Sequence, residues 1–319
     1  MLLPTLIDLR RPEGKELDPE DIFGSSLGGV FTDDLQNQHG DDPDTVIVYK
    51  SARHGKLEFR TADIDGEEQR RKMAHYLWNA GVLMAEIVGG RAAPVGERGS
   101  REGEGEGWED GKWWVGPEEE EKWSVQGESV IELGAGVGLG GITSALAGAE
   151  KVTITDYPAP PILSAIKANV TTNLKGPLAD RADVQGHLWG DVESDFAAAN
   201  ARKYTRVLAA DCLWMLGEHE NLAKSMLHFL ADTPSARVFC IAGFHTGRAK
   251  VAPFFEEVVP AQGLEVEEIY EMDADGARRP WATERDGGTE NIGERKKWLV
   301  VARLRRRSPS PSTTSVSNP

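Results

Sequence analysis

The chain has 319 residues, 39% of them hydrophobic, so it is long enough to bury the core of one large domain or two small ones. Asp and Glu outnumber Lys and Arg by 52 to 36, and the net charge of -16 argues against a partner whose phosphate backbone needs a basic surface. Cys212 and Cys240 are the only cysteines, and both lie in apolar runs. We therefore expect no nucleic-acid partner, no disulfide framework, and buried thiols in a reducing compartment.

Neither a membrane segment nor a metal site is predicted. The apolar start, Met1–Ile7, is too short for a secretory signal, and no apolar run reaches about 18 residues. HExxH and CxxC pairs do not occur, so we expect no metal. The predicted location is the cytoplasm, with the nucleus as the alternative, and no membrane partner is expected.

Composition divides the chain into a main domain, residues 71–304, and less regular parts. Residues 1–70 are predicted to be an N-terminal extension, with strand-like segments at Phe23–Phe31 and Val46–Tyr49. Residues 89–124 are rich in Gly, Glu and Arg and are predicted to form a disordered insertion. Its four tryptophans favour the alternative that part of it docks on the body; they are Trp108, Trp113, Trp114 and Trp123. Composition also predicts a disordered tail over residues 305–319.

Strands and helices alternate through the main domain. The predicted strands are Ser129–Leu133, Lys151–Thr155, Val184–His187, Arg206–Ala210, Arg237–Gly243, Leu264–Tyr270 and Trp298–Leu304. The predicted helices are Gly141–Ala149, Pro161–Leu174, Glu220–Leu230 and Val251–Val259. Because parallel neighbours need a crossover connection, this order predicts a doubly wound α/β fold with a mostly parallel sheet. Ligands of such sheets bind at the carboxyl ends of the strands.

A glycine-rich turn follows the first of these strands. The segment from Glu132 to Gly138 reads Glu-Leu-Gly-Ala-Gly-Val-Gly, and its glycines let the backbone turn sharply and lie directly against a ligand. Gly136, Gly138 and Gly141 also satisfy the GxGxxG spacing of dinucleotide sites. In those sites the first glycine follows the strand at once; here that residue is Gly134, and its frame lacks the last glycine. The charge of Glu132 would also repel a pyrophosphate.

An acid stands at the end of the second strand. Asp156 lies 22 residues beyond Gly134, where a carboxylate accepts hydrogen bonds from the hydroxyls of a ribose. Taken alone, Asp156 is equally well explained as a helix cap before Pro158. Together with Glu132 and the glycine turn, it predicts a nucleoside cofactor without specifying which one.

These residues resemble motifs one and two of the class I S-adenosylmethionine-dependent methyltransferases. Three further segments narrow the resemblance to the lysine methyltransferase-like family of seven-β-strand enzymes: Leu77–Gly81 on a predicted helix, Leu188–Gly190 after the third strand and Asp211–Trp214 after the fourth. The resemblance implies a Rossmann-like, doubly wound, seven-stranded sheet, mostly parallel with a final antiparallel strand. The family includes fungal proteins labelled nicotinamide N-methyltransferase and enzymes that methylate the N terminus and nearby lysines of translation elongation factor 1A.

The resemblance also implies which residues contact S-adenosylmethionine. Asp156 would hold the ribose, Trp189 would flank the adenine and Ala210 would lie against the cofactor. The full set carried over is Trp78, Glu132, Gly134, Ala135, Gly136, Gly138, Asp156, Tyr157, Trp189 and Ala210. After the fourth strand the family usually has Tyr or Phe where this chain has Trp214, so a role for a tyrosine hydroxyl does not carry over.

Methyl transfer from a sulfonium demands in-line positioning, and an amine nucleophile must first be neutral. A lysine ammonium, with a pKa near 10.4, loses its proton more easily in an apolar, aromatic site. We expect Trp214, with Trp78, to form that wall and Asp211 to orient the amine by hydrogen bonding. Asp211 and Trp214 are therefore the predicted catalytic residues. His219 and His245, which follow the fourth and fifth strands, are candidate bases of lower rank.

The predicted reaction is S-adenosylmethionine-dependent N-methylation of a protein lysine or N-terminal amine, as in the elongation-factor enzymes. The acidic composition favours a basic, amine-bearing protein segment as the partner. Transfer to a small-molecule amine of the nicotinamide type is the runner-up, because its pyridine nitrogen needs no base. An NAD-linked oxidoreductase and a non-catalytic cofactor-fold binding module are the alternatives from other classes.

Overall fold

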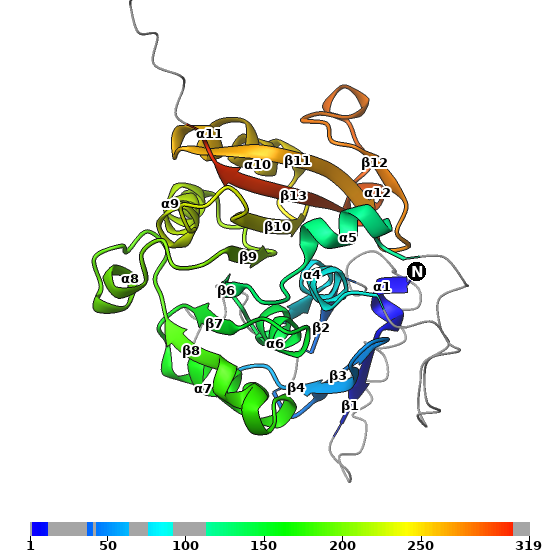
Figure 1. Cartoon of the computed structure of the whole chain (residues 1–319). Helices are drawn as coiled ribbons and strands as arrows, with labels where there is room; N and C mark the ends of the chain where they lie inside the picture. The colour runs from blue at the N-terminus through cyan, green and yellow to red at the C-terminus, as the bar shows by residue number, and fades with distance from the viewer. Residues whose placement is uncertain (1, 12–36, 41–42, 64–75, 92–112, 309–319) are drawn as a thin grey trace, which may run out of the picture.

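The computed structural model describes residues 2–11, 37–40, 43–63, 76–91 and 113–308. Its centre is an eight-stranded sheet with the order β12-β11-β13-β10-β9-β6-β7-β8 (Figure 1). In chain order these strands are β6 Ser129–Leu133, β7 Lys151–Asp156, β8 Ala182–Gly186, β9 Arg206–Ala210, β10 Arg237–Gly243, β11 Leu264–Asp273, β12 Arg278–Pro280 and β13 Trp298–Arg306. This arrangement confirms the predicted α/β fold.

Strand direction changes only at one edge of the sheet. The five strands from β8 to β10 are mutually parallel, whereas β13 is antiparallel to both β10 and β11. The eighth strand, β12, was not predicted. It pairs antiparallel with β11 across a turn at Gly276.

Helices cover both faces of the sheet and bury two apolar cores. Alternate residues of β6 point to opposite cores, with Val130 in one and Ile131 in the other, as the two-residue period of a strand requires. One core contains residues of α4 Asn79–Gly89, α6 Leu139–Leu146 and α7 Pro160–Asn173. The other contains residues of α8 Asp195–Asn200, α9 His219–Phe229, α10 Arg248–Pro253 and α11 Val259–Ala261. Because β6 has cores on both sides, apolar residues point to both of its faces, and Glu132 is the one acidic residue among them.

The short elements complete the described chain. A π-helical segment, Phe254–Val258, joins α10 to α11, so the single predicted helix over 251–259 is one part of a longer, irregular helical run. The remaining short helices are α1 Leu2–Thr5, η2 Gly176–Arg181, η3 Leu216–Glu218, η5 Asp286–Gly288 and α12 Ile292–Lys296. Within the described ranges, no helix is both long and apolar enough to cross a membrane.

The N-terminal part adds a separate small sheet with the order β1-β3-β4. Its strands are β1 Ile7–Arg10, β3 Val46–Ser51 and β4 Gly55–Phe59, so the predicted strand at 46–49 is confirmed, while the one at 23–31 lies outside the described residues. Asn169 and Asn173 of α7 accept hydrogen bonds from the backbone N–H groups of Arg60 and Glu58, each at 2.9 Å. These side chains attach the small sheet to the main domain.

A two-stranded ladder precedes α4 where a helix was predicted. β2 Gln38–His39 pairs antiparallel with β5 Leu77–Trp78. Trp78 has extended backbone angles, and the helix begins only at Asn79. The prediction that residues 77 and 78 are helical was therefore wrong, because pairing with a distant segment decides their conformation.

Part of the predicted insertion is ordered, so that prediction was wrong at both ends. Residues 89–91 follow from α4, and residues 113–124 contain helix α5, Pro117–Trp123. Trp114 and Trp123 are only 2% and 0% exposed. Burial of their aromatic surface offsets the entropy lost when this end of the segment becomes ordered. The composition of the segment as a whole, rich in Gly, Glu and Arg, does not reveal this local contribution. Residues 92–112, including Trp108, lie outside the described residues.

A buried carboxyl group joins this ordered part to the rest. Glu86 of α4 is 2% exposed and accepts hydrogen bonds from the Tyr49 hydroxyl and from Trp114 Nε1, the latter at 2.9 Å. Burial raises the pKa of Glu86 above its usual value, and the two hydrogen bonds reverse only part of that increase. The contact ties the small sheet, α4 and the segment before α5 together.

The tail begins later than predicted. β13 continues through Arg305 and Arg306, and Arg306 Nε donates to the Leu230 carbonyl at 3.1 Å. The prediction of disorder from residue 305 was therefore wrong for these two positions, because their backbone pairs with β11. Residues 309–319 lie outside the described residues.

Candidate active site

A cavity opens where β6, β7 and β9 end. Nine of the ten predicted cofactor residues line it, together with both predicted catalytic residues, Asp211 and Trp214. The nine are Trp78, Glu132, Gly134, Ala135, Gly136, Asp156, Tyr157, Trp189 and Ala210. Gly138 does not line the cavity; it precedes α6 with a φ of +81°. The site thus lies at the carboxyl edge of the parallel strands, as the topology predicted.

The glycine turn after β6 needs glycine for two reasons. Gly134 and Gly136 have φ values of +65° and +58°, which side chains rarely adopt. A Cβ on Gly134 would also lie 2.8 Å from both the Trp189 ring and Cys212 Sγ. A side chain at this position would therefore displace the wall of the cavity.

Asp156 supports the same turn from the end of β7. Its carboxylate accepts hydrogen bonds from the backbone N–H groups of Gly136 and Tyr157, at 2.7 and 2.6 Å, one on each oxygen. Burial raises the pKa of Asp156 above its usual value, and these two hydrogen bonds reverse only part of that increase. The helix-cap explanation of Asp156 fails, because the N-cap residue of α7 is Ala159 and no side chain caps that helix.

Glu132 lies beneath the turn and is 3% exposed. Its Oε2 accepts a hydrogen bond from the Gly141 N–H in the first turn of α6, at 2.8 Å. Burial raises the pKa of Glu132 to about 8, with a smaller increase from the charge of Asp156. A carboxyl in this position stabilises the positive end of the helix dipole when ionised.

Asp211 is held rigidly in the turn after β9. It has a left-handed φ of +56° although it is not glycine, and its N–H donates to the Ile241 carbonyl at 2.8 Å. Its Oδ1 accepts a hydrogen bond from the Gly243 N–H, and its Oδ2 lies 2.9 Å from His245 Nε2. These contacts fix the direction of the carboxylate in the cavity wall.

The two candidate histidine bases do not line the cavity. His219 is buried, with Nε2 2.9 Å from the Leu213 carbonyl, and His245 lies behind Asp211. A different histidine, His187, does line it. Its Nε2 is 2.9 Å from Ser225 Oγ, and burial lowers its pKa to about 4. His187 directly precedes the Leu-Trp-Gly segment and ends the predicted strand at 184–187, and these two sequence signals could have identified it.

The charge of the cavity wall has one sign. Four acidic side chains line it, those of Glu132, Asp156, Asp211 and Glu218, whereas none of its described lining residues is Lys or Arg. With its pKa at about 8, Glu132 is mainly protonated at neutral pH unless a cation lies beside it. Glu218 and Cys212 are further lining residues that the sequence reasoning did not include. Such a wall favours a cationic ligand over a phosphate-bearing one.

A family model described as lysine methyltransferase matches residues 58–259. The chain belongs to the lysine methyltransferase family. It is 29% identical over 215 residues to a protein N-terminal and lysine N-methyltransferase, EFM7, of Gibberella zeae, covering 63% of this chain and 70% of the relative. It is 27% identical over 203 residues to the protein of the same name from Schizosaccharomyces pombe, covering 62% and 67% respectively.

A solved structure shares the fold of this lysine methyltransferase. The crystal structure of SMU.776, a methyltransferase complexed with SAH, superposes with a TM-score of 0.50 at 10% identity, covering 89% of this chain and 65% of that one. At this identity the likeness shows the fold alone. Family membership confirms the predicted enzyme class, an S-adenosylmethionine-dependent protein N-methyltransferase, and the alternatives of an NAD-linked oxidoreductase and a non-catalytic module are set aside.

Replacement of Glu132 by Gln is expected to change the pH dependence of stability in this lysine methyltransferase. Since the pKa of Glu132 is raised from 4.5 to about 8 in the folded protein, the folded state binds this proton more tightly than the unfolded state. The stability from that proton is fully present below about pH 4.5 and is lost as the pH rises to about 8. The difference in free energy of unfolding between Glu132→Gln and wild type should therefore increase in favour of the variant as the pH rises from 5 to 9.

Urea unfolding at several pH values measures this difference. Glu150→Gln, at an exposed position, is the control and should differ from wild type by a constant amount. A Glu132→Gln difference that stays constant over the same range would contradict the assignment of a raised pKa.

Proposed function

We propose that the cavity binds S-adenosylmethionine and receives an amine of a protein substrate, either an N-terminal α-amine or a lysine side chain. The observation that carries this proposal is the composition of the wall: four acidic side chains with aromatic rings and, among the described lining residues, no Lys or Arg. S-adenosylmethionine is a sulfonium with an α-ammonium group, and the acceptor arrives as an ammonium ion. Both therefore suit a wall of this charge.

The residues present fit the cofactor. Gly134 and Gly136 leave backbone exposed where a side chain would otherwise intrude. Each oxygen of Asp156 accepts one backbone hydrogen bond and keeps capacity to accept a second from a ribose hydroxyl. Trp189 presents its ring beside Gly134, where it can flank an adenine. A bound cation would also offset the burial that raises the pKa values of Glu132 and Asp156.

The acceptor side is formed by Asp211, Trp214 and Trp78. When bound, S-adenosylmethionine supplies an electrophilic methyl group on its sulfonium. The Asp211 carboxylate accepts hydrogen bonds from the amine and orients it, while the two indole rings exclude water and favour loss of the ammonium proton. Each transfer forms one nitrogen–carbon bond, breaks one sulfur–carbon bond and releases one proton to solvent.

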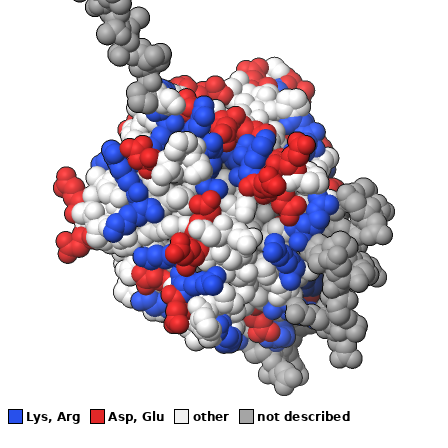
Figure 2. Space-filling view, viewed as in Figure 1, with Lys and Arg blue, Asp and Glu red and all other residues white. Residues whose placement is uncertain are grey.

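Charge outside the cavity gives little support for a basic partner. Residues outside the described ranges contribute -11 of the net -16. On the face drawn in Figure 2, basic and acidic side chains are interspersed without a large area of one sign. We therefore place the selection of an amine in the cavity rather than on the surface at large.

The relatives' names, protein N-terminal and lysine N-methyltransferase, agree with a protein amine as the acceptor, and the family resemblance of the sequence makes elongation factor 1A the first protein to test. Recombinant elongation factor 1A would be incubated with the enzyme and S-adenosylmethionine, digested and examined by mass spectrometry. We expect added methyl groups on the N-terminal peptide or on a nearby lysine. Methylation of nicotinamide, with none on the protein, would contradict the proposal and support the small-molecule alternative.

Trp214→Ala is expected to lower kcat about tenfold while leaving the dissociation constant of S-adenosylmethionine within about twofold. The physical reason is loss of the aromatic wall that receives the amine, a contact worth about 1 to 2 kcal/mol in a desolvated site. Isothermal titration gives the affinity and a methyl-transfer assay gives kcat. Trp214→Phe keeps a ring and should recover most of the rate. Equal losses of rate and affinity would place Trp214 against the cofactor instead.

A further inference from the structure

His245 contacts two side chains that line the cavity. Its Nε2 is 2.9 Å from Oδ2 of Asp211, and its ring centroid is 4.5 Å from that of Trp78. Both of these side chains line the cavity, whereas His245 itself is not among its described lining residues. Inside the cavity, His245 can therefore affect a ligand through Asp211 and Trp78.

The chain makes room for this imidazole at Gly243. A Cβ on Gly243 would lie 2.4 Å from His245 Nε2, so any larger residue at the end of β10 would push the ring away from Asp211. Gly243 does not have a positive φ, so backbone conformation does not require glycine there. The space for His245 accounts for it.

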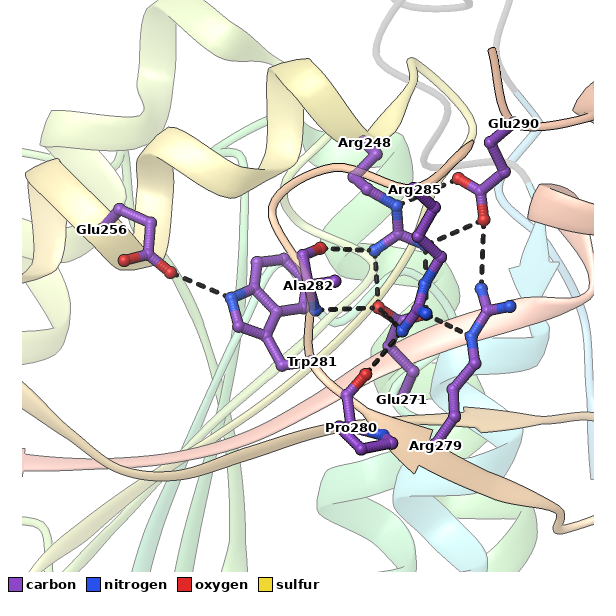
Figure 3. A network of polar contacts seen from close by, with 9 residues as sticks. All are labelled: Arg248, Glu256, Glu271, Arg279, Pro280, Trp281, Ala282, Arg285 and Glu290. Carbon is purple, nitrogen blue, oxygen red and sulfur yellow. Dashed lines mark hydrogen bonds and ion pairs between the residues drawn. The ribbon is translucent and has the colours of Figure 1, made fainter. Parts of the chain in front are cut away.

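The turn that carries His245 is itself anchored. Arg248, three residues further along, lies over the Phe244 ring at 4.1 Å and forms ion pairs with Glu271 and Glu290. Figure 3 shows Arg248, Glu271 and Glu290 in a network that joins the start of α10 to β11 and to the loop after β12. His245 thus lies on a turn that these contacts hold in place, as a residue that positions Asp211 and Trp78 requires.

We propose that His245 is a positioning residue of the acceptor site. In this arrangement its Nε2–H donates to Asp211, the tautomer that an ionised carboxylate selects, and its ring supports the indole of Trp78. It thereby aims the carboxylate at the point where the transferable methyl group and the incoming amine meet. This inference rests on the proposed function, since it assumes that the cavity binds S-adenosylmethionine.

The test uses two ligands that differ at that point. Sinefungin carries an amine-bearing carbon where S-adenosylmethionine has its sulfonium and methyl group, whereas S-adenosylhomocysteine has only a sulfur. The ratio of their dissociation constants, measured by isothermal titration, therefore reports how well Asp211 meets a cation, without need of the acceptor or of turnover. We expect the wild type to prefer sinefungin.

Three variants separate positioning from general damage. His245→Ala and Gly243→Ala should each reduce the preference for sinefungin about tenfold, as expected for a misplaced hydrogen bond to a charged group, with S-adenosylhomocysteine affinity within about twofold. His245→Gln retains an N–H donor and should keep most of the preference. His228→Gln, whose ring bonds to the Ala197 carbonyl away from the cavity, is the control and should match wild type.

The outcomes are distinguishable. A wild type that binds neither ligand would overturn the proposed function itself. A wild type that binds both but does not prefer sinefungin would overturn the inference alone, because Asp211 would then not face the methyl position. So would an unchanged preference in His245→Ala and Gly243→Ala, or a loss in His245→Gln as large as in His245→Ala.

Discussion

Asp156→Ala is expected to raise the dissociation constant of S-adenosylmethionine at least about tenfold. Loss of a hydrogen bond to a charged group costs about 1.5 to 3 kcal/mol, and a ribose offers two hydroxyls to this carboxylate. The variant also removes the acceptor that holds the Gly136 and Tyr157 N–H groups. The glycine turn should therefore lose its shape as well as its ribose partner.

Isothermal titration of the cofactor measures this effect. Asp183→Ala is a matched control, because Asp183 lies on the neighbouring strand β8 but is exposed and does not line the cavity. That control should bind as tightly as the wild type. Unchanged affinity in Asp156→Ala would mean that the ribose binds elsewhere and would remove the basis of the cofactor assignment.

Glu271→Gln is expected to lower the free energy of unfolding by about 3 to 5 kcal/mol. Glu271 is fully buried and accepts hydrogen bonds from Arg248, Arg279 and Arg285 (Figure 3). Burial alone would raise the pKa of Glu271, but the arginines lower it below its usual value. Glutamine keeps the volume of the side chain but removes its negative charge. The three guanidinium groups of the network would then share a single carboxylate, that of Glu290.

Urea unfolding gives the change, and Glu294→Gln is the control. Glu294 pairs with Lys297 at 2.7 Å and its side chain is 64% exposed, so its loss should cost less than about 1 kcal/mol. Similar losses in the two variants would show that the buried network contributes no more than an ordinary surface ion pair. Because the network anchors the turn that carries His245, the folded fraction of Glu271→Gln is also expected to have a lower kcat.

The sequence predicted those parts of the fold that local patterns determine. β9 and β10 match the predicted strands residue for residue, because each is a short apolar run buried on both faces and bounded by turns. Nine of the ten residues predicted to contact the cofactor line one cavity, and their role in binding it stays a prediction. Most of them lie within or directly after β6, β7 and β9, so their spacing along the chain fixes their position at the sheet edge.

The parts that were missed depend on contacts between distant segments. Leu77 and Trp78 are extended because they pair with β2, and the start of α5 is ordered because Trp114 reaches Glu86. The contact between His245 and Asp211 spans 34 residues. It follows from the adjacency of β9 and β10, which brings together the turns after them, but no property of either residue alone indicates it.

The most direct test of the account follows labelled methyl groups from S-adenosylmethionine in a host-cell lysate. Gel-resolved proteins and the small-molecule fraction would be counted separately for the wild type and for Asp211→Ala. If the protein methylates an amine that Asp211 orients, we expect label in a discrete protein band with the wild type and little or none with the variant. Label confined to the small-molecule fraction, or a protein band of equal strength with both enzymes, would contradict it.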